Sequence, residues 1–217
     1  MMPQVSNDVF QIADSIMYDL YTKGAFGGLE IWQIMSWSRR NSSWMDQMGL
    51  SVDHGATKIV IFAEDLGDWV IKFNAKLDDN YKHIDYMARE YENYLKAVEA
   101  GYGEYFAATI DCGEAPCGLH YYLQQACMVD DDDKFETLYD TLKEQYESCG
   151  MDYDDDDLAE QVDEFEDDEI CSIFLGVDDD GDFMHWLWDH DINDLHRGNF
   201  GWRKNHYVIL DYSGYYG

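Results

Sequence analysis

The feature that most constrains this chain is a short polar loop followed closely by an apolar strand. Residues 194–199 read Asp-Leu-His-Arg-Gly-Asn, and the run Val-Ile-Leu at 208–210 leads directly into Asp211. Carboxylate and amide oxygens are ligands that magnesium prefers, and a further carboxylate can orient an attacking hydroxyl. The spacing therefore predicts a site that holds a nucleotide's phosphates through magnesium. Asp, Asn and Gly also crowd ordinary turns, and that is the alternative reading.

Composition limits the classes of partner and the number of domains. The 217 residues carry a net charge of −32, and 46% of them are apolar and 16% aromatic. Such a chain can bury a core, and its length predicts one domain or two small lobes around one cleft. The negative charge excludes direct binding to nucleic acid or to anionic membranes, and favours basic proteins or nucleic-acid-binding proteins as partners. Proteins of halophiles have a similar excess of acidic residues, which holds their solvation shell. The five cysteines and the many aromatic residues argue against this explanation.

Cysteine usage and the absence of targeting signals predict a cytoplasmic location, in the host if the protein is viral. The five cysteines show no paired spacing suited to zinc or to a disulfide scaffold, which fits a reducing compartment. The N-terminus lacks the basic and apolar regions of a signal peptide. No apolar run approaches the ~20 residues that a membrane span needs, so we expect no membrane association.

The first part of the chain predicts helices and short strands in alternation. Hydrophobic periodicity indicates helices over residues 7–21, 29–38 and 82–100. The β-type runs at 58–62 and 69–73 flank a turn and read as a hairpin. Two further strands are expected at 105–110 and 120–126.

Residues 130–182 form an acidic region with 17 Asp and 7 Glu against 2 Lys, a net charge of −22. Two helical stripes persist inside it, so we expect a folded, acid-faced insertion and not a disordered tail. Asp runs that precede helices cap them and favour their dipoles. The first stripe consists of Phe135, Leu138, Tyr139, Leu142 and Tyr146, and the second of Leu158, Val162 and Phe165.

After the acidic region, we expect a loop over 189–198 and a final hairpin, 199–202 with 207–210.

The loop and strand around Asp211 resemble the catalytic loop and metal-binding strand of the protein-kinase and aminoglycoside-phosphotransferase superfamily. The Asp-Leu-His-Arg-Gly-Asn segment resembles the Asp-Leu-His-x-Gly-Asn form of antibiotic phosphotransferases. The resemblance implies ATP and Mg²⁺ as cofactors, Asp194 as the catalytic residue, and Asn199 and Asp211 as metal ligands.

The same resemblance assigns a phosphate-contacting lysine and its acidic partner. Lys72 ends the run Val-Ile-Lys on the second strand of the hairpin, and Glu90 borders the apolar face of the helix that follows. A solvated lysine on an alternating strand and an ordinary surface glutamate are the alternatives. Gly55 and Lys58 lie where the family has its phosphate-cradling loop, in which Lys58 could compensate for Asp53.

The implied fold is α+β and protein-kinase-like, with a small antiparallel-sheet lobe and a reduced, mostly helical second lobe. Residues 1–49 form an added helical segment and 50–129 the small lobe. Residues 130–217 form the reduced large lobe, with the insertion at 130–182 and the catalytic hairpin at 189–211. The sequence departs from the family in three places. The phosphate-cradling loop keeps only the middle one of the family's glycines, and the segment after Asp211 reads Tyr-Ser-Gly. No activation segment or Ala-Pro-Glu motif follows.

Two functions of different classes follow. In the first, the chain binds ATP and magnesium and can transfer phosphate to a hydroxyl of a protein or small molecule. Alternatively, it is a catalytically weak or inactive kinase-like protein whose acidic face mimics nucleic acid and inhibits a basic partner, as inhibitors from phages do. The short chain and missing elements fit such a viral origin.

Other clusters give weaker signals. Asp178, Asp180 and Asp182 begin with calcium-loop spacing but lack the required Gly, so a calcium site is disfavoured. The histidines at 185, 190 and 196 could bind a transition metal, although an ordinary polar loop is the expected reading. Cys112 and Cys117 have no base partner in the sequence pattern, so a thiol nucleophile has little support.

Overall fold

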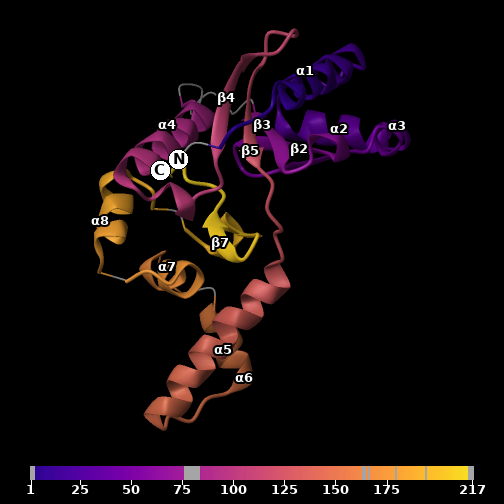
Figure 1. The fold of residues 1–217 in the computed structure, drawn as a ribbon. Helices are drawn as coiled ribbons and strands as arrows, with labels where there is room; N and C mark the ends of the chain where they lie inside the picture. The colour runs from indigo at the N-terminus through magenta and orange to yellow at the C-terminus, as the bar shows by residue number, and fades with distance from the viewer. Residues whose placement is uncertain are drawn as a thin grey trace. The chain divides into compact units, whose positions relative to one another are not determined.

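Strands and helices alternate in the computed structural model, which describes residues 3–75, 84–162, 165, 167–178, 180–193 and 195–214. The protein is α+β, with a small antiparallel sheet and several helices (Figure 1). It divides into two compact units. The first unit is Met1–Gly103 with Ala107–Ala126, and the second is Glu104–Phe106 with Cys127–Gly217. In the parts of the chain so described, no helix is both long and apolar enough to cross a membrane.

The first unit is built on a five-stranded antiparallel sheet with the strand order β1-β2-β3-β5-β4. The predicted hairpin at 58–62 and 69–73 is confirmed as β2 and β3, which pair around the short 3-10 turn η1 (Glu64–Leu66). Sequence periodicity did not predict β1, because most of its side chains are polar or exposed. The strands are β1 (Leu50–His54), β2 (Lys58–Ala63), β3 (Trp69–Asn74), β4 (Thr109–Glu114) and β5 (His120–Gln125).

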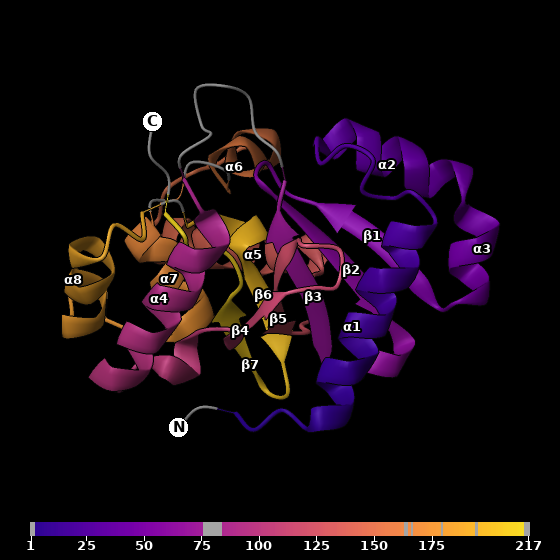
Figure 2. The ribbon, with the colours of Figure 1, turned by 90° about the horizontal axis from the view of Figure 1, so that it is seen from above.

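Alternation along the strands separates an apolar face from a polar one. One face carries the buried side chains of Ile59, Ile71 and Leu123, which pack with Met17 and Ile34 into the apolar core. The helices on this side are gathered beside β1 to β3 (Figure 2). They are α1 (Asn7–Thr22), α2 (Ile31–Arg40) and α3 (Ser42–Gln47), of which the first two confirm predicted helices.

Helix α4 (Tyr86–Ala100) is the predicted helix that follows the hairpin, and it contacts β3 and β4. It begins later than the predicted residue 82. Asp85 is its N-cap, and this carboxylate accepts a hydrogen bond from the backbone N–H of Ala88 at 2.9 Å. Gly101 ends it with φ +92°, a left-handed conformation that glycine adopts without a Cβ penalty. Residues 82 and 83 lie outside the described part of the chain.

The second unit contains the acidic region, whose described residues form helices, as predicted. Asp130 and Asp154 cap the helices that follow them, since each accepts hydrogen bonds from first-turn N–H groups. The predicted second stripe was too long, because the helix ends at Gln161 and Phe165 lies beyond it. The elements are α5 (Asp131–Cys149), α6 (Asp155–Gln161), α7 (Asp167–Leu175), α8 (Asp182–Asp189), and the hairpin β6 (Phe200–Arg203) with β7 (His206–Ile209).

Two local predictions were wrong. The strand expected at 105–110 begins at Thr109, because Tyr105 ends a 3-10 turn, η2 (Gly103–Tyr105), and packs its ring against Phe183 at 4.5 Å between centroids. The segment around His185 is not a loop but helix α8, which buries Phe183 together with Met184 and Leu187. A helix of only 8 residues gives too short a periodic signal to be separated from a loop.

Candidate functional site

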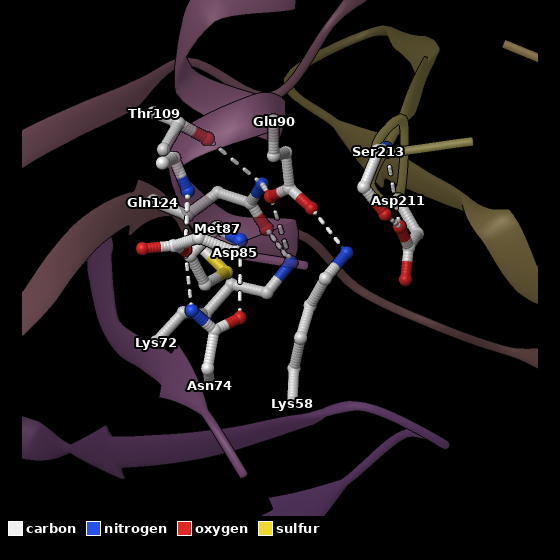
Figure 3. Close-up of polar contacts among 11 residues, drawn as sticks. Lys58, Lys72, Asn74, Asp85, Met87, Glu90, Thr109, Gln124, Asp211 and Ser213 are labelled. Atoms are coloured by element: carbon white, nitrogen blue, oxygen red, sulfur yellow. Dashed lines mark hydrogen bonds and ion pairs between the residues drawn. The ribbon is translucent and has the colours of Figure 1, made fainter. Parts of the chain in front are cut away.

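A buried polar network on the sheet of the first unit joins both lysines predicted for the phosphate site to one glutamate. Glu90 is fully buried on α4, and its Oε1 lies 3.1 Å from the Nζ of Lys72. Its Oε2 lies 2.6 Å from the Nζ of Lys58. Figure 3 shows the carboxylate held between the two ammonium groups. The expected pairing of Lys72 with Glu90 is therefore present, and Lys58 shares the same carboxylate.

Two further side chains complete the network, and neither was predicted from the sequence. Gln124 accepts a hydrogen bond from Lys72 at 2.9 Å through Oε1, and its Nε2 donates to Glu90 Oε1 at 2.6 Å. The same amide donates to the hydroxyl of Thr109 at 3.0 Å. Strand register explains the convergence, because Gln124 faces Thr109 across β4 and β5 and lies on the same sheet face as Lys72. The available signal was a glutamine directly after the aromatic and apolar run Tyr121–Leu123 of β5.

The start of α4 is fixed to the end of β3, which sets the position of Glu90. The amide of Asn74 donates to the carboxylate of Asp85, and its Oδ1 accepts the backbone N–H of Met87 at 3.1 Å (Figure 3). Tyr122 is the register partner of Lys72 on the neighbouring strand. Burial, and then the negative charge of Asp85, raise the pKa of Tyr122, so its hydroxyl stays protonated.

Gly55 lies in the exposed turn between β1 and β2, where its backbone N–H donates to the carbonyl of Lys58 at 3.0 Å. A Cβ at this position would meet nothing within 4 Å, so contacts inside the first unit do not require a glycine. Lys58 opens β2, but its side chain is buried against Glu90. The N–H of Gly55 is therefore used within the turn, and the ammonium group of Lys58 is paired with Glu90 on α4.

In the second unit, the two predicted metal ligands flank the β6–β7 hairpin, one just before β6 and the other two residues after β7. Asn199 ends the 3-10 turn η4 (Arg197–Asn199), and its carbonyl accepts the backbone N–H of Leu210 at 2.7 Å. Asp211 follows Leu210, and its Oδ1 accepts the hydroxyl of Ser213 at 3.1 Å. An amide and a carboxylate are the oxygen donors that Mg²⁺ takes from proteins, with water and phosphate filling the remaining positions. In the chemistry of their donor atoms, these two side chains therefore suit Mg²⁺.

The segment after Asp211 is fixed by close packing against the loop that leads to residue 194. Gly214 has φ +73°, and a Cβ there would lie 2.0 Å from the carbonyl oxygen of Asp191. Only glycine fits this approach, which explains its place three residues after Asp211. Asp194, the predicted catalytic residue, lies outside the described residues. Its neighbour Leu195 is buried.

Lys134, on α5, fastens the turn that carries Asn199. The residue is 1% exposed, and its Nζ donates to the carbonyls of Arg197 at 2.6 Å and Phe200 at 3.1 Å. Asp131, one turn earlier, forms an ion pair with it at 2.8 Å. The sequence showed Lys134 only as one of two lysines in an acidic region. Its role could not be read from a helical pattern, because its partners are backbone groups far along the chain.

The weaker metal signals do not gather into sites. Across the part of the chain that the structure describes, no three His, Cys, Asp or Glu side chains lie close enough to hold a metal ion. His190 stacks on Trp186 at 4.2 Å between ring centroids, and His196 accepts the N–H of Gly198 within its own turn. Within the described ranges, the five cysteines form no disulfide. Burial raises the pKa of Cys112 to about 12, which disfavours its nucleophilic thiolate form.

Comparison with known protein families, with curated proteins and with solved structures finds no match.

Proposed function

We propose that this is a kinase-like protein that binds ATP with magnesium, the first unit supplying the small lobe and the second a reduced, mostly helical lobe. The observation that carries the proposal is the buried ion pair between Lys72 on β3 and Glu90 on α4. Such a pair can hold the lysine ammonium group in one position, where it contacts the phosphates. The kinase family uses a lysine–glutamate pair in this way. The chain order of hairpin, helix and two strands supports the same reading.

The proposal gives each residue a role. Lys72 contacts the phosphates and Glu90 holds its ammonium group, while Lys58 adds positive charge beside the same carboxylate. Asn199 and Asp211 hold magnesium, which neutralises charge on the phosphates when it is bound. Asp194 orients the acceptor hydroxyl and accepts its proton. Gly55 lies in the turn that covers the phosphates.

Thermal unfolding with and without ATP and magnesium tests the binding step. A ligand at 100 times its dissociation constant stabilises the folded state by about 2.7 kcal/mol, so the unfolding midpoint should rise by several degrees. The rise should disappear in Lys72→Met and in Asp211→Asn, each measured against its own ligand-free sample. Lys96→Met, an exposed lysine of α4, is the matched control and should keep the rise. A wild-type protein without the rise, or a rise that needs neither magnesium nor Asp211, contradicts the proposal.

A second candidate function is the capture of a basic protein by the acidic face, and the exposure of the acidic first turns favours it. The carboxylates of 131–133 on α5 and of 155–157 on α6 lie at the surface of the folded second unit. α5 and α6 also pack against each other, so these charges are held on a structured support. A rigid array of carboxylates can resemble the phosphate charges of a nucleic acid to a basic protein.

Binding of a fluorescent nonaarginine peptide tests this candidate. Affinity should fall steeply between about 50 and 200 mM salt, because screening weakens attraction between exposed charges. Changing residues 154–157 from Asp to Asn should weaken binding, and Asn at 154 preserves the helix cap. The control changes four exposed aspartates of the first unit, at positions 8, 46, 65 and 68, to Asn. Equal weakening by the two variants would show that only total charge matters and would remove support for a docking face.

A further inference from the structure

A small pocket lies in the second unit where the start of α5 meets the β6–β7 hairpin. Its volume is about 200 Å³. This is below the roughly 300–1,000 Å³ of sites for drug-sized ligands, so it suits the end of one long side chain. The lining residues are Met128, Asp130, Asp133, Trp202 and Tyr207.

Two aromatic rings and a thioether form the apolar wall. Trp202 and Tyr207 are register partners on the hairpin, with ring centroids 4.9 Å apart and planes at 75°. The backbone of Met128 exchanges two hydrogen bonds with Trp202, at 2.8 and 3.0 Å, which fixes the methionine beside the ring. Met128 is 68% exposed and Trp202 38% exposed, so a large apolar surface is left open to solvent.

Two carboxylates form the other side of the pocket. Asp130 accepts the N–H groups of Asp132 and Asp133, both at 3.2 Å, and so is fixed as the N-cap of α5. Asp133 is exposed on the first turn of that helix. Burial, then the negative charge of Asp133, raise the pKa of Tyr207, whereas a hydrogen bond with Thr137 lowers it. The two carboxylates and the aromatic wall thus line the same pocket.

The nearest lysine in the sequence does not line the pocket. Lys134 follows Asp133, but its ammonium group is buried against the carbonyls of Arg197 and Phe200. The chain itself has an arginine–aromatic pair two residues after Asp133 on the same helix, where the Arg197 guanidinium lies 5.2 Å from the centre of the Phe135 ring. An aromatic wall facing carboxylates is an arrangement that attracts a planar cation.

We propose that this pocket receives an arginine side chain of a basic protein partner. The guanidinium stacks on Trp202 and donates hydrogen bonds to Asp133, while its methylene stem lies along Met128. Arginine suits the pocket better than lysine, because its flat, weakly hydrated head can stack on a ring and bind a carboxylate at once. The inference rests on the second candidate function, for which it names one anchoring point.

The test is a titration of protein labelled with ¹³C at its methionine methyl groups, followed by NMR at constant ionic strength. The probes are N-acetyl-arginine amide, the lysine analogue, and the neutral citrulline analogue, which has nearly the shape of arginine. The Met128 signal is assigned by its loss in Met128→Leu. It should shift saturably with the arginine compound, less with the lysine compound and not with the citrulline compound.

Variants separate the pocket from general attraction to an acidic protein. Asp133→Asn should weaken arginine binding about tenfold, the effect expected for a lost hydrogen bond between charged groups. Asp132→Asn, the same change on a neighbouring residue that does not line the pocket, should weaken it less than twofold. Trp202→Leu should remove the saturable shift, with the unfolding midpoint recorded to confirm that the variant is folded.

The outcomes also separate this inference from the function on which it rests. Uniform shifts of all methionine methyls, or equal weakening by Asp132→Asn and Asp133→Asn, overturn the pocket even if nonaarginine binds through residues 154–157. Failure of the nonaarginine peptide to bind is recorded independently and argues against the acidic face as a whole.

Discussion

Buried charged residues fix the most specific geometry in this chain. Lys58 and Lys72 share the carboxylate of Glu90 in the first unit, and Lys134 binds two backbone carbonyls in the second. Burying a charge is costly unless it is paired and hydrogen-bonded, so each of these partners is needed for the fold as well as for any site built on it. Exchange of one such residue should therefore affect stability more than most surface changes do.

Lys134→Met makes this argument testable. The change keeps most of the apolar stem but leaves the carbonyls of Arg197 and Phe200 without their ammonium donor. Loss of hydrogen bonds to buried groups should lower the free energy of unfolding by about 2–4 kcal/mol. Urea denaturation measures the loss, and Lys143→Met on the same helix provides the comparison. If both variants lose equally little, Lys134 does not hold the Asn199 turn in solution.

At the scale of elements, most helices and strands with a clear apolar pattern were predictable, including the short hairpin strands β2 and β3. Helices α1, α2, α4 and α5 each present enough apolar residues at helical spacing to be found from the sequence. Strand β1 and helix α8 escaped, because one carries few apolar side chains and the other is only 8 residues long. Element ends were set by contacts distant in sequence, such as the packing of Tyr105 on Phe183.

The residues of the candidate site also fall into a group that was predictable from the sequence and a group that was not. Lys72, Glu90, Asn199 and Asp211 were named from a motif resemblance. The structure places the first two in an ion pair and the last two on either side of the β6–β7 hairpin. Gln124 and Thr109 could not be found in that way, since their contribution depends on the register between β4 and β5. Lys134 likewise depends on a tertiary contact.

At the scale of the whole molecule, charge is the dominant property. The net charge is −32, of which −22 falls in residues 130–182. Self-repulsion of this size opposes the compact state, although Asp at helix N-termini offsets part of it by capping and by its interaction with the helix dipole. The caps at Asp130 and Asp154 show how acidic residues can support the helices that carry them.

Salt should therefore stabilise this protein. Raising KCl from about 20 to about 500 mM shortens the screening length from roughly 20 Å to roughly 4 Å, which weakens repulsion between exposed carboxylates. We expect the unfolding midpoint to rise by several degrees, and amide hydrogen exchange in α5 and α6 to slow more than in α4. KCl is the appropriate salt, because sulfate stabilises proteins in general through exclusion from their surface.

An unfolding midpoint that stays constant or falls would show that the helix caps and dipoles, which salt also screens, outweigh the repulsion. The charge would then have to be explained by partner binding alone.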